Sequence, residues 1–171
     1  MRKLACTAAL VMLASACGPA AGPAAQLAAP AVATDDALAA VQRAQVQACP
    51  TDRVQSSARS EGFGAFQGVT IEDVANVPMS GAPARTLALQ RVTVAPGGII
   101  GWHAHDGGQG MALLVSGRVT EARNDCLDMI AFEPGDVTLE SADTIHSFRN
   151  DGVDPAVFLV WSGAPISAAQ P

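Results

Sequence analysis

Residues 97–117 read GGIIGWHAHDGGQGMALLVSG and contain two of the three histidines of this 171-residue chain. His103 and His105 stand one residue apart. In a β-strand, residues i and i+2 point to the same side, so both imidazoles would be directed at one point, as metal ligands are. A single histidine is more often a surface or core residue than a ligand. His146, in residues 135–150 (GDVTLESADTIHSFRN), would add a ligand from a second strand.

These two stretches resemble the two sequence motifs of the cupin superfamily. The first motif runs Gly, five residues, His-x-His, three or four residues, Glu, six residues, Gly. The second runs Gly, five residues, Pro-x-Gly, two residues, His, three residues, Asn. The matching positions are Gly97, His103, His105 and Gly117 in the first motif, and Gly135, His146 and Asn150 in the second. The resemblance covers about residues 86–163 and implies an all-β, cupin-like jelly-roll sandwich or barrel with a metal site at the three histidines.

The chain departs from this pattern at the fourth ligand, which is a glutamate in the family. With the longer spacing Gly110 takes that place, and with the shorter spacing Gln109 does. A glutamine carbonyl oxygen can bind a metal ion, so we expect Gln109 to be the fourth ligand. This register leaves one residue too many before Gly117 and therefore requires a β-bulge. In the second motif, Ser141 and Asp143 replace the proline and the glycine.

The N-terminus has the order of an export signal. Two basic residues precede a short apolar run, residues 4–13, which is too short to span a bilayer and suits the core of a signal peptide. Ala-Ser-Ala at 14–16 fits a cleavage site, and Cys17 follows at once. This resembles a bacterial lipoprotein signal, although the usual leucine three residues before the cysteine is here four before it. Residues 1–16 are therefore a predicted signal peptide, and either Cys17 is lipidated or the mature protein is secreted without an anchor.

The rest of the chain divides into three predicted segments. Residues 17–33 are rich in proline and alanine and predict a flexible tether. Residues 34–68 predict an N-terminal helix, over 34–48, followed by an irregular segment. Residues 69–165 predict the β-barrel domain. Its expected strands are residues 86–94, 99–105, 111–116, 118–122, 129–132, 144–149 and 156–161. The last of these, AVFLVW, is apolar without alternation and should be buried on both faces.

Charge and composition exclude several classes of function. The chain has a net charge of −6, and loss of the signal peptide would change it to about −8. An acidic protein is a poor nucleic-acid binder. The only lysine, Lys3, would leave with the signal, so the mature protein could neither form a Schiff base nor build a P-loop. Because all three histidines belong to one expected site, a separate Ser-His-Asp triad is also excluded.

The cysteines fit an exported protein. Cys6 would leave with the signal peptide, and Cys17 would become the mature N-terminus. Cys49 and Cys126 remain, and in an oxidising compartment we expect them to form a disulfide. The alternative is two free thiols whose Cα atoms lie too far apart.

The expected cofactor is one divalent metal ion, with Fe, Mn, Ni and Zn all suited to the ligands. The resemblance to cupins implies dioxygenase, isomerase, lyase or decarboxylase chemistry on a small molecule, without selecting one reaction. Two alternatives stay open: a cupin lipoprotein that binds a small molecule or a metal without turnover, and a degenerate jelly roll without metal.

The protein is expected either in the periplasm or at the outer membrane as a lipoprotein, or outside the cell as a secreted protein. We expect membrane contact only through a lipid anchor at Cys17, and a homodimer is left open.

Overall fold

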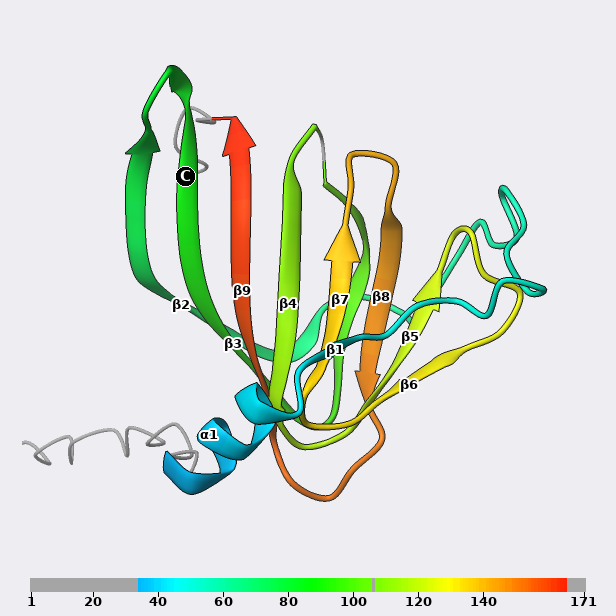
Figure 1. The fold of residues 1–171 in the computed structure, drawn as a ribbon. Helices are drawn as coiled ribbons and strands as arrows, with labels where there is room; N and C mark the ends of the chain where they lie inside the picture. The colour runs from blue at the N-terminus through cyan, green and yellow to red at the C-terminus, as the bar shows by residue number, and fades with distance from the viewer. Residues whose placement is uncertain (1–33, 106, 166–171) are drawn as a thin grey trace, which may run out of the picture.

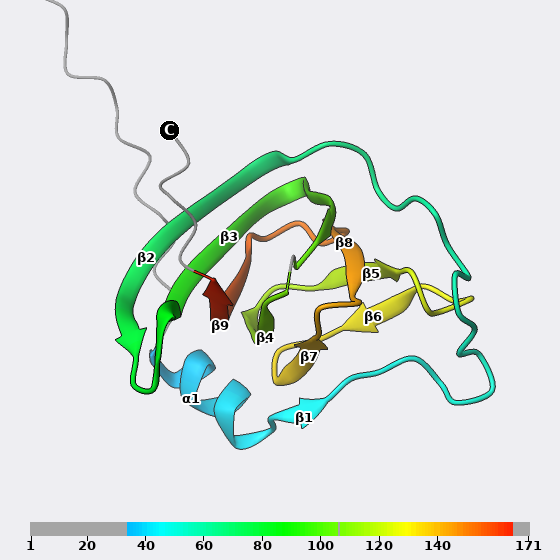
Figure 2. The ribbon, with the colours of Figure 1, turned by 90° about the horizontal axis from the view of Figure 1, so that it is seen from above.

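The computed structural model describes residues 34–105 and 107–165. Its elements, in chain order, are α1 (Thr34–Gln42), β1 (Gln45–Val46), β2 (Gln67–Met79), β3 (Ala82–Ala104), β4 (Gln109–Ser116), β5 (Val119–Arg123), β6 (Ile130–Phe132), β7 (Asp136–Glu140), β8 (Ile145–Asn150) and β9 (Ala156–Pro165). The strands form one sheet in the order β1-β7-β4-β9-β3-β8-β5-β6, and β2 pairs with β3. The sheet curls into an open barrel, with α1 outside it (Figures 1 and 2). The expected all-β jelly-roll fold with one N-terminal helix is confirmed.

β3 is the longest strand and carries the histidine pair. The sequence predicts separate strands at 86–94 and 99–105 with a turn between them, and this is wrong because β3 runs through both. Gly97 has a positive φ of 70°, and β3 has extra residues between its pairs with Val69 and Gln67 of β2. The Pro-Gly-Gly segment is therefore a bulge inside one strand. Before the bulge β3 pairs with β9, and after it with β8, so this strand joins two parts of the barrel.

The sheet has a core on each face. The inner core is made of Val92, Val94, Ala112, Leu114, Val119, Cys126, Ile130, Phe132, Phe148, Ala156 and Phe158. A smaller outer core lies under α1, where Ala40 packs with Leu113 and Val115. β9 contributes Phe158 to the inner core and Leu159 to the outer one, which confirms that this strand is covered on both faces.

The helix α1 is shorter than predicted, because the segment after it pairs with the sheet. The sequence predicts a helix over residues 34–48, but the backbone N–H groups of Gln45 and Gln47 donate to carbonyls of Gly135 and Val137. These bonds form β1 along the edge of β7. Pairing with β7 thus replaces the last turn of the predicted helix, since a short helix is only marginally stable without packing.

β7 has its polar side chains on the inside. Neither β7 nor β2 is among the strands predicted from the sequence. Asp136, Thr138 and Glu140 are buried, whereas Leu139 is exposed and Val137 packs against the outer core. This alternation is the reverse of the usual apolar-inside pattern of a half-buried strand.

A disulfide joins Cys49 to Cys126, as predicted, with the Cα atoms 5.6 Å apart. It ties the segment between β1 and β2 to the loop between β5 and β6. Two further contacts join the same two segments. Arg53 forms an ion pair with Asp128, with 2.7 Å between Nε and Oδ2, and Val54 forms an isolated β-bridge with Cys126. The segment after the helix is thus anchored to the barrel although it contains little regular structure.

The predicted signal peptide (1–16), the tether (17–33) and the lipidation site Cys17 lie outside the described residues. Across 34–105 and 107–165, no helix is both long enough and apolar enough to cross a membrane.

Candidate metal centre

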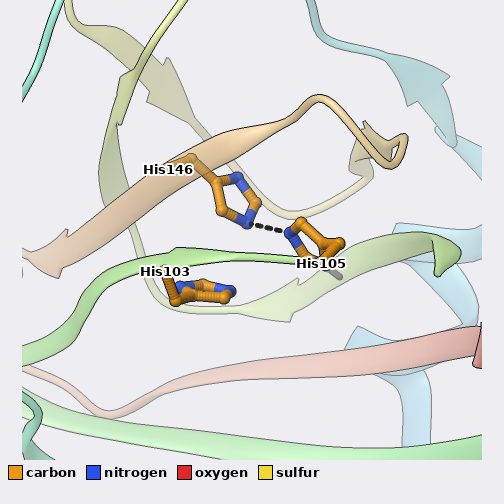
Figure 3. A group of neighbouring side chains, drawn as sticks. All are labelled: His103, His105 and His146. Carbon is orange, nitrogen blue, oxygen red and sulfur yellow. Dashed lines mark hydrogen bonds between the residues drawn. The ribbon is translucent and has the colours of Figure 1, made fainter. Parts of the chain in front are cut away.

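β3 and β8 bring the three histidines together. His103 lies near the end of β3 and is the direct antiparallel partner of His146 on β8. His105 follows the last residue of β3. One ligand nitrogen from each ring lies within 4.8 Å of the other two, and Figure 3 shows the three rings facing one another. The convergence expected from the His-x-His spacing and the distant third histidine is therefore present.

Hydrogen bonds fix two of the rings with one nitrogen directed toward the cluster. His103 Nδ1 lies 2.8 Å from the carbonyl oxygen of Gly101. A carbonyl only accepts, so Nδ1 carries a proton, and in the neutral ring Nε2 then holds the lone pair. His146 Nδ1 lies 2.6 Å from Glu121 Oε1, an arrangement that likewise orients a ligand histidine through its outer nitrogen.

The spacing of the inner nitrogens suits a shared ion. His105 Nε2 and His146 Nε2 are 3.0 Å apart, as the dashed line in Figure 3 marks. Two nitrogens held about 2.1 Å from one ion at a right angle would lie about 3 Å apart. Burial lowers the pKa of His146 well below its usual value, and the charges of His103 and Arg123 lower it further. The ring is therefore neutral at physiological pH, which is the form that binds metal.

Two buried glutamates flank the histidines. Glu121 on β5 is fully buried, and its carboxylate accepts from Arg123 Nη1 at 3.5 Å as well as from His146. Burial raises the pKa of Glu121 to about 7, although Arg123 counteracts part of the rise. Glu140 on β7 is also buried. Burial first, and the charge of Glu121 second, raise the pKa of Glu140 to about 7.

The cluster thus offers three imidazoles with two carboxylates beside them, on strands of one barrel. Comparison with known families identifies the domain that carries this cluster. Residues 90–162 match the sequence profile of the cupin domain. This part of the chain is a cupin domain.

Several solved structures match part of the chain. A protein from Thermus thermophilus is 24% identical, over 53% of this chain and 82% of its own, with a TM-score of 0.42. KdgF from a Halomonas species is 18% identical, over 61% of this chain and 88% of its own, with a TM-score of 0.47. A cupin barrel protein from Salinispora arenicola is 20% identical, over 58% of this chain and 80% of its own, with a TM-score of 0.44. No curated protein matches the chain.

The histidines of the cupin domain line a cavity of about 300 Å³. Most of its wall is apolar: Phe66, Val69, Ile71, Val92, Ile100, Ala112, Phe148, Phe158 and Val160. The Phe148 ring lies 4.9 Å from that of His146, between centroids, and Phe66 lies 5.9 Å from His103. Gln90 and Ser162 add polar groups to the wall. The site therefore combines metal-binding groups with an apolar chamber large enough for a small molecule.

Gln109, the expected fourth ligand, also lines this cavity, but its residue is exposed. The bulge that its register requires is present in β4, between Leu114 and Ser116. Metal binding by Gln109 stays a prediction. The two flanking glutamates, Glu121 and Glu140, were missed by sequence reasoning. Glu140 could have been found from the alternation of polar and apolar residues in DVTLE (136–140), if this segment is taken as a strand whose polar side chains face inward. The segment was not predicted as a strand.

Proposed function

We propose that this protein is an exported cupin that holds one divalent metal ion through His103, His105 and His146 and acts on a small molecule bound beside it. The observation that carries the proposal is the convergence of three imidazoles on the wall of an apolar cavity. Fe, Mn, Ni and Zn all accept imidazole ligands with oxygen donors beside them. Dioxygenase, isomerase and lyase reactions are the chemical classes that such a site supports.

A bound ion would supply Lewis-acid polarisation of a substrate oxygen, or O₂ activation in the case of iron. The protein's own groups do the rest. Glu121 keeps the Nδ1 proton of His146 in place, so that Nε2 stays available to the ion. The apolar wall would favour the apolar part of a bound molecule. Gln90 and Ser162 can donate to polar groups of a molecule bound there. A suitable molecule has an apolar body and oxygen atoms at one end.

Metal analysis of variants tests the site. We expect His103→Ala and His146→Ala to give folded proteins with little metal, because each removes one direct ligand, whereas Gln109→Ala should keep most of it. The fold should survive because the apolar strands provide most of the burial. His103 is the better position for the main test, since His146 is fully buried and its removal leaves a cavity.

The measurement is the metal-to-protein ratio of each purified protein, with circular dichroism as the check on folding. Gln109→Ala is the comparison variant, because Gln109 lines the same cavity and is expected to contribute less to the affinity than a histidine. Equal metal content in the wild type and in both histidine variants would contradict the proposal and leave a jelly roll without a metal function.

Turnover separates an enzyme from a binding protein. The metal-loaded protein would be assayed for O₂ uptake and for conversion of diol and keto-acid compounds, with His103→Ala as the control. Conversion that depends on His103 supports the enzyme. Binding without conversion would instead identify a non-catalytic cupin that captures a small molecule.

A further inference from the structure

The chain lacks the glutamate that the first cupin motif places on the strand after His-x-His. We propose that Glu140, on the neighbouring strand β7, supplies this carboxylate and is the fourth ligand of the ion. The inference rests on the proposed metal site. It gives that site a ligand that stands at neither of the two positions, 109 and 110, where the motif would place a glutamate.

Glu140 lies directly opposite the motif position that lacks a glutamate. Gly110 of β4 and Glu140 of β7 are partners in the antiparallel register. Gly110 alternates with Ala112 and Leu114, whose side chains belong to the inner core, so position 110 faces into the barrel. A Cβ atom built on Gly110 would lie only 2.7 Å from Glu140 Oε2. The Glu140 carboxylate therefore occupies the space into which a side chain at position 110 would point.

The carboxylate of Glu140 reaches two of the three histidines. Its Oε2 lies 3.5 Å from His105 Nδ1, and its Oε1 lies 3.8 Å from His146 Nε2. The His146 nitrogen is the same one that faces the cluster. The His105 contact is with the outer nitrogen of that ring, because its Nε2 is the atom that lies 3.0 Å from His146 Nε2. Glu140 therefore approaches the proposed ion from the side of His146, and the pairing of β7 with β4 already holds it there.

Charge favours the same arrangement. Glu140 is buried, and an isolated carboxylate away from water is strongly disfavoured unless a cation compensates it. A divalent ion held by neutral imidazoles provides that compensation, and one carboxylate lowers the net charge of such a site to +1. Carboxylate oxygens are ligands for each of the metals that suit the three histidines.

The geometry of β4 explains why the carboxylate comes from β7. The Cβ atom built on Gly110 would also lie 2.8 Å from the carbonyl oxygen of Trp161, a backbone atom of β9. A side chain at this position would therefore strain the pairing of β4 with β9. Gln109 also lines the cavity, but its residue is exposed, whereas Glu140 is buried beside the histidines.

The test compares five proteins, namely the wild type, three glutamate variants and His103→Ala, for binding of Co(II), whose visible absorption spectrum reports the ligands around the ion. Glu140→Gln keeps the size and removes the charge, and Glu140→Leu removes every donor atom. Glu133→Gln is the matched control, because it also removes one acidic charge from a glutamate that pairs with Arg118 at the surface. Affinity is measured by titration calorimetry, and thermal melting confirms that each variant is folded.

We expect both Glu140 variants to bind Co(II) at least about tenfold more weakly, since even groups one step removed from a metal contribute 10- to 100-fold to affinity. Their Co(II) spectrum should differ from that of the wild type, while Glu133→Gln matches the wild type in both measurements. Unchanged affinity in Glu140→Leu would overturn the assignment. So would weaker binding with an unchanged spectrum, because Glu140 would then act only by positioning His105.

Failure of the site as a whole gives a different result. If the wild type and His103→Ala bind Co(II) equally weakly, then the proposed metal function fails, and the assignment of Glu140 fails with it. If His103→Ala loses binding but Glu140→Leu does not, then the metal function stands and only the role of Glu140 is wrong.

Discussion

Glu121 contacts the outer nitrogen of His146 and is fully buried behind it. Its carboxylate also accepts from Thr138 Oγ1 at 3.4 Å and from Arg123. These bonds hold the carboxylate in one position, and the carboxylate in turn holds the imidazole ring. Glu121 is thus a positioning residue for His146, and its effect on the proposed ion would be transmitted through that ring.

Glu121→Gln should weaken metal binding without removing a ligand. An amide can present either its oxygen or its NH₂ group to His146 Nδ1, so it fixes the ring less firmly than a carboxylate does. We expect the metal affinity to fall about 10- to 100-fold, with a Co(II) spectrum that keeps the wild-type form. Titration calorimetry and the spectrum check this, with Glu133→Gln as the control for loss of charge. Wild-type affinity in Glu121→Gln would contradict the role of Glu121.

The histidines could be predicted from the sequence, whereas the glutamates could not. His103 and His105 are predicted by their spacing, because a period of two on a strand fixes their common direction. The position of Glu121 and Glu140 depends on which strands become neighbours and on which side of them faces inward. That information lies in the pairing of β4 with β7 and of β5 with β8, which local patterns do not contain.

The disulfide adds a covalent link to an irregular segment that an ion pair and backbone hydrogen bonds also attach to the barrel. It closes a loop with a sequence separation of 77 residues, and loop-closure entropy for such a length corresponds to about 4 kcal/mol. We expect the double variant Cys49→Ala, Cys126→Ala to keep its circular dichroism spectrum and to lose about 4 kcal/mol of unfolding free energy in urea. Reduced wild-type protein should unfold at a similarly lowered urea concentration.

Peptide mapping under non-reducing conditions provides the direct check. It should show one cross-linked pair, Cys49 with Cys126. Two thiols that can be alkylated in folded protein that was never reduced would contradict the bond. An unchanged unfolding free energy in the double variant would contradict its contribution to stability.

Element boundaries were predictable where an apolar run ends at a local turn. The strands around residues 111–116, 118–122 and 156–161 were predicted close to their observed positions. Tertiary pairing overrode local signals elsewhere. The Pro-Gly-Gly segment reads as a turn, yet neighbours on both sides of β3 keep it inside a strand. The predicted end of α1 is too late because the pairing of residues 45–47 with β7 is non-local.

For the whole protein, the N-terminal sequence makes a separate prediction about location. Basic residues, a short apolar run and Ala-Ser-Ala-Cys predict that the mature chain starts at Cys17 and carries lipid there. We expect the protein expressed in a Gram-negative bacterium to partition with membranes. Mass spectrometry of the N-terminal peptide measures this directly, and Cys17→Ser is the control that should release the protein. An unmodified Cys17 would mean secretion without an anchor, and an intact Met1 would contradict export.

Gly110 has a consequence for how this protein can change over successive mutations. A glutamate at position 110 would place its Cβ atom against Glu140 Oε2 and against the carbonyl oxygen of Trp161. Loss of Glu140 would relieve the first contact only, because the second is with the backbone of a strand paired on both sides. To regain a glutamate at position 110, the protein would have to change both position 110 and position 140. The intermediate variant would either lack a carboxylate at the site or have a strained sheet. A lineage that moved its acidic group to β7 would find that move hard to reverse.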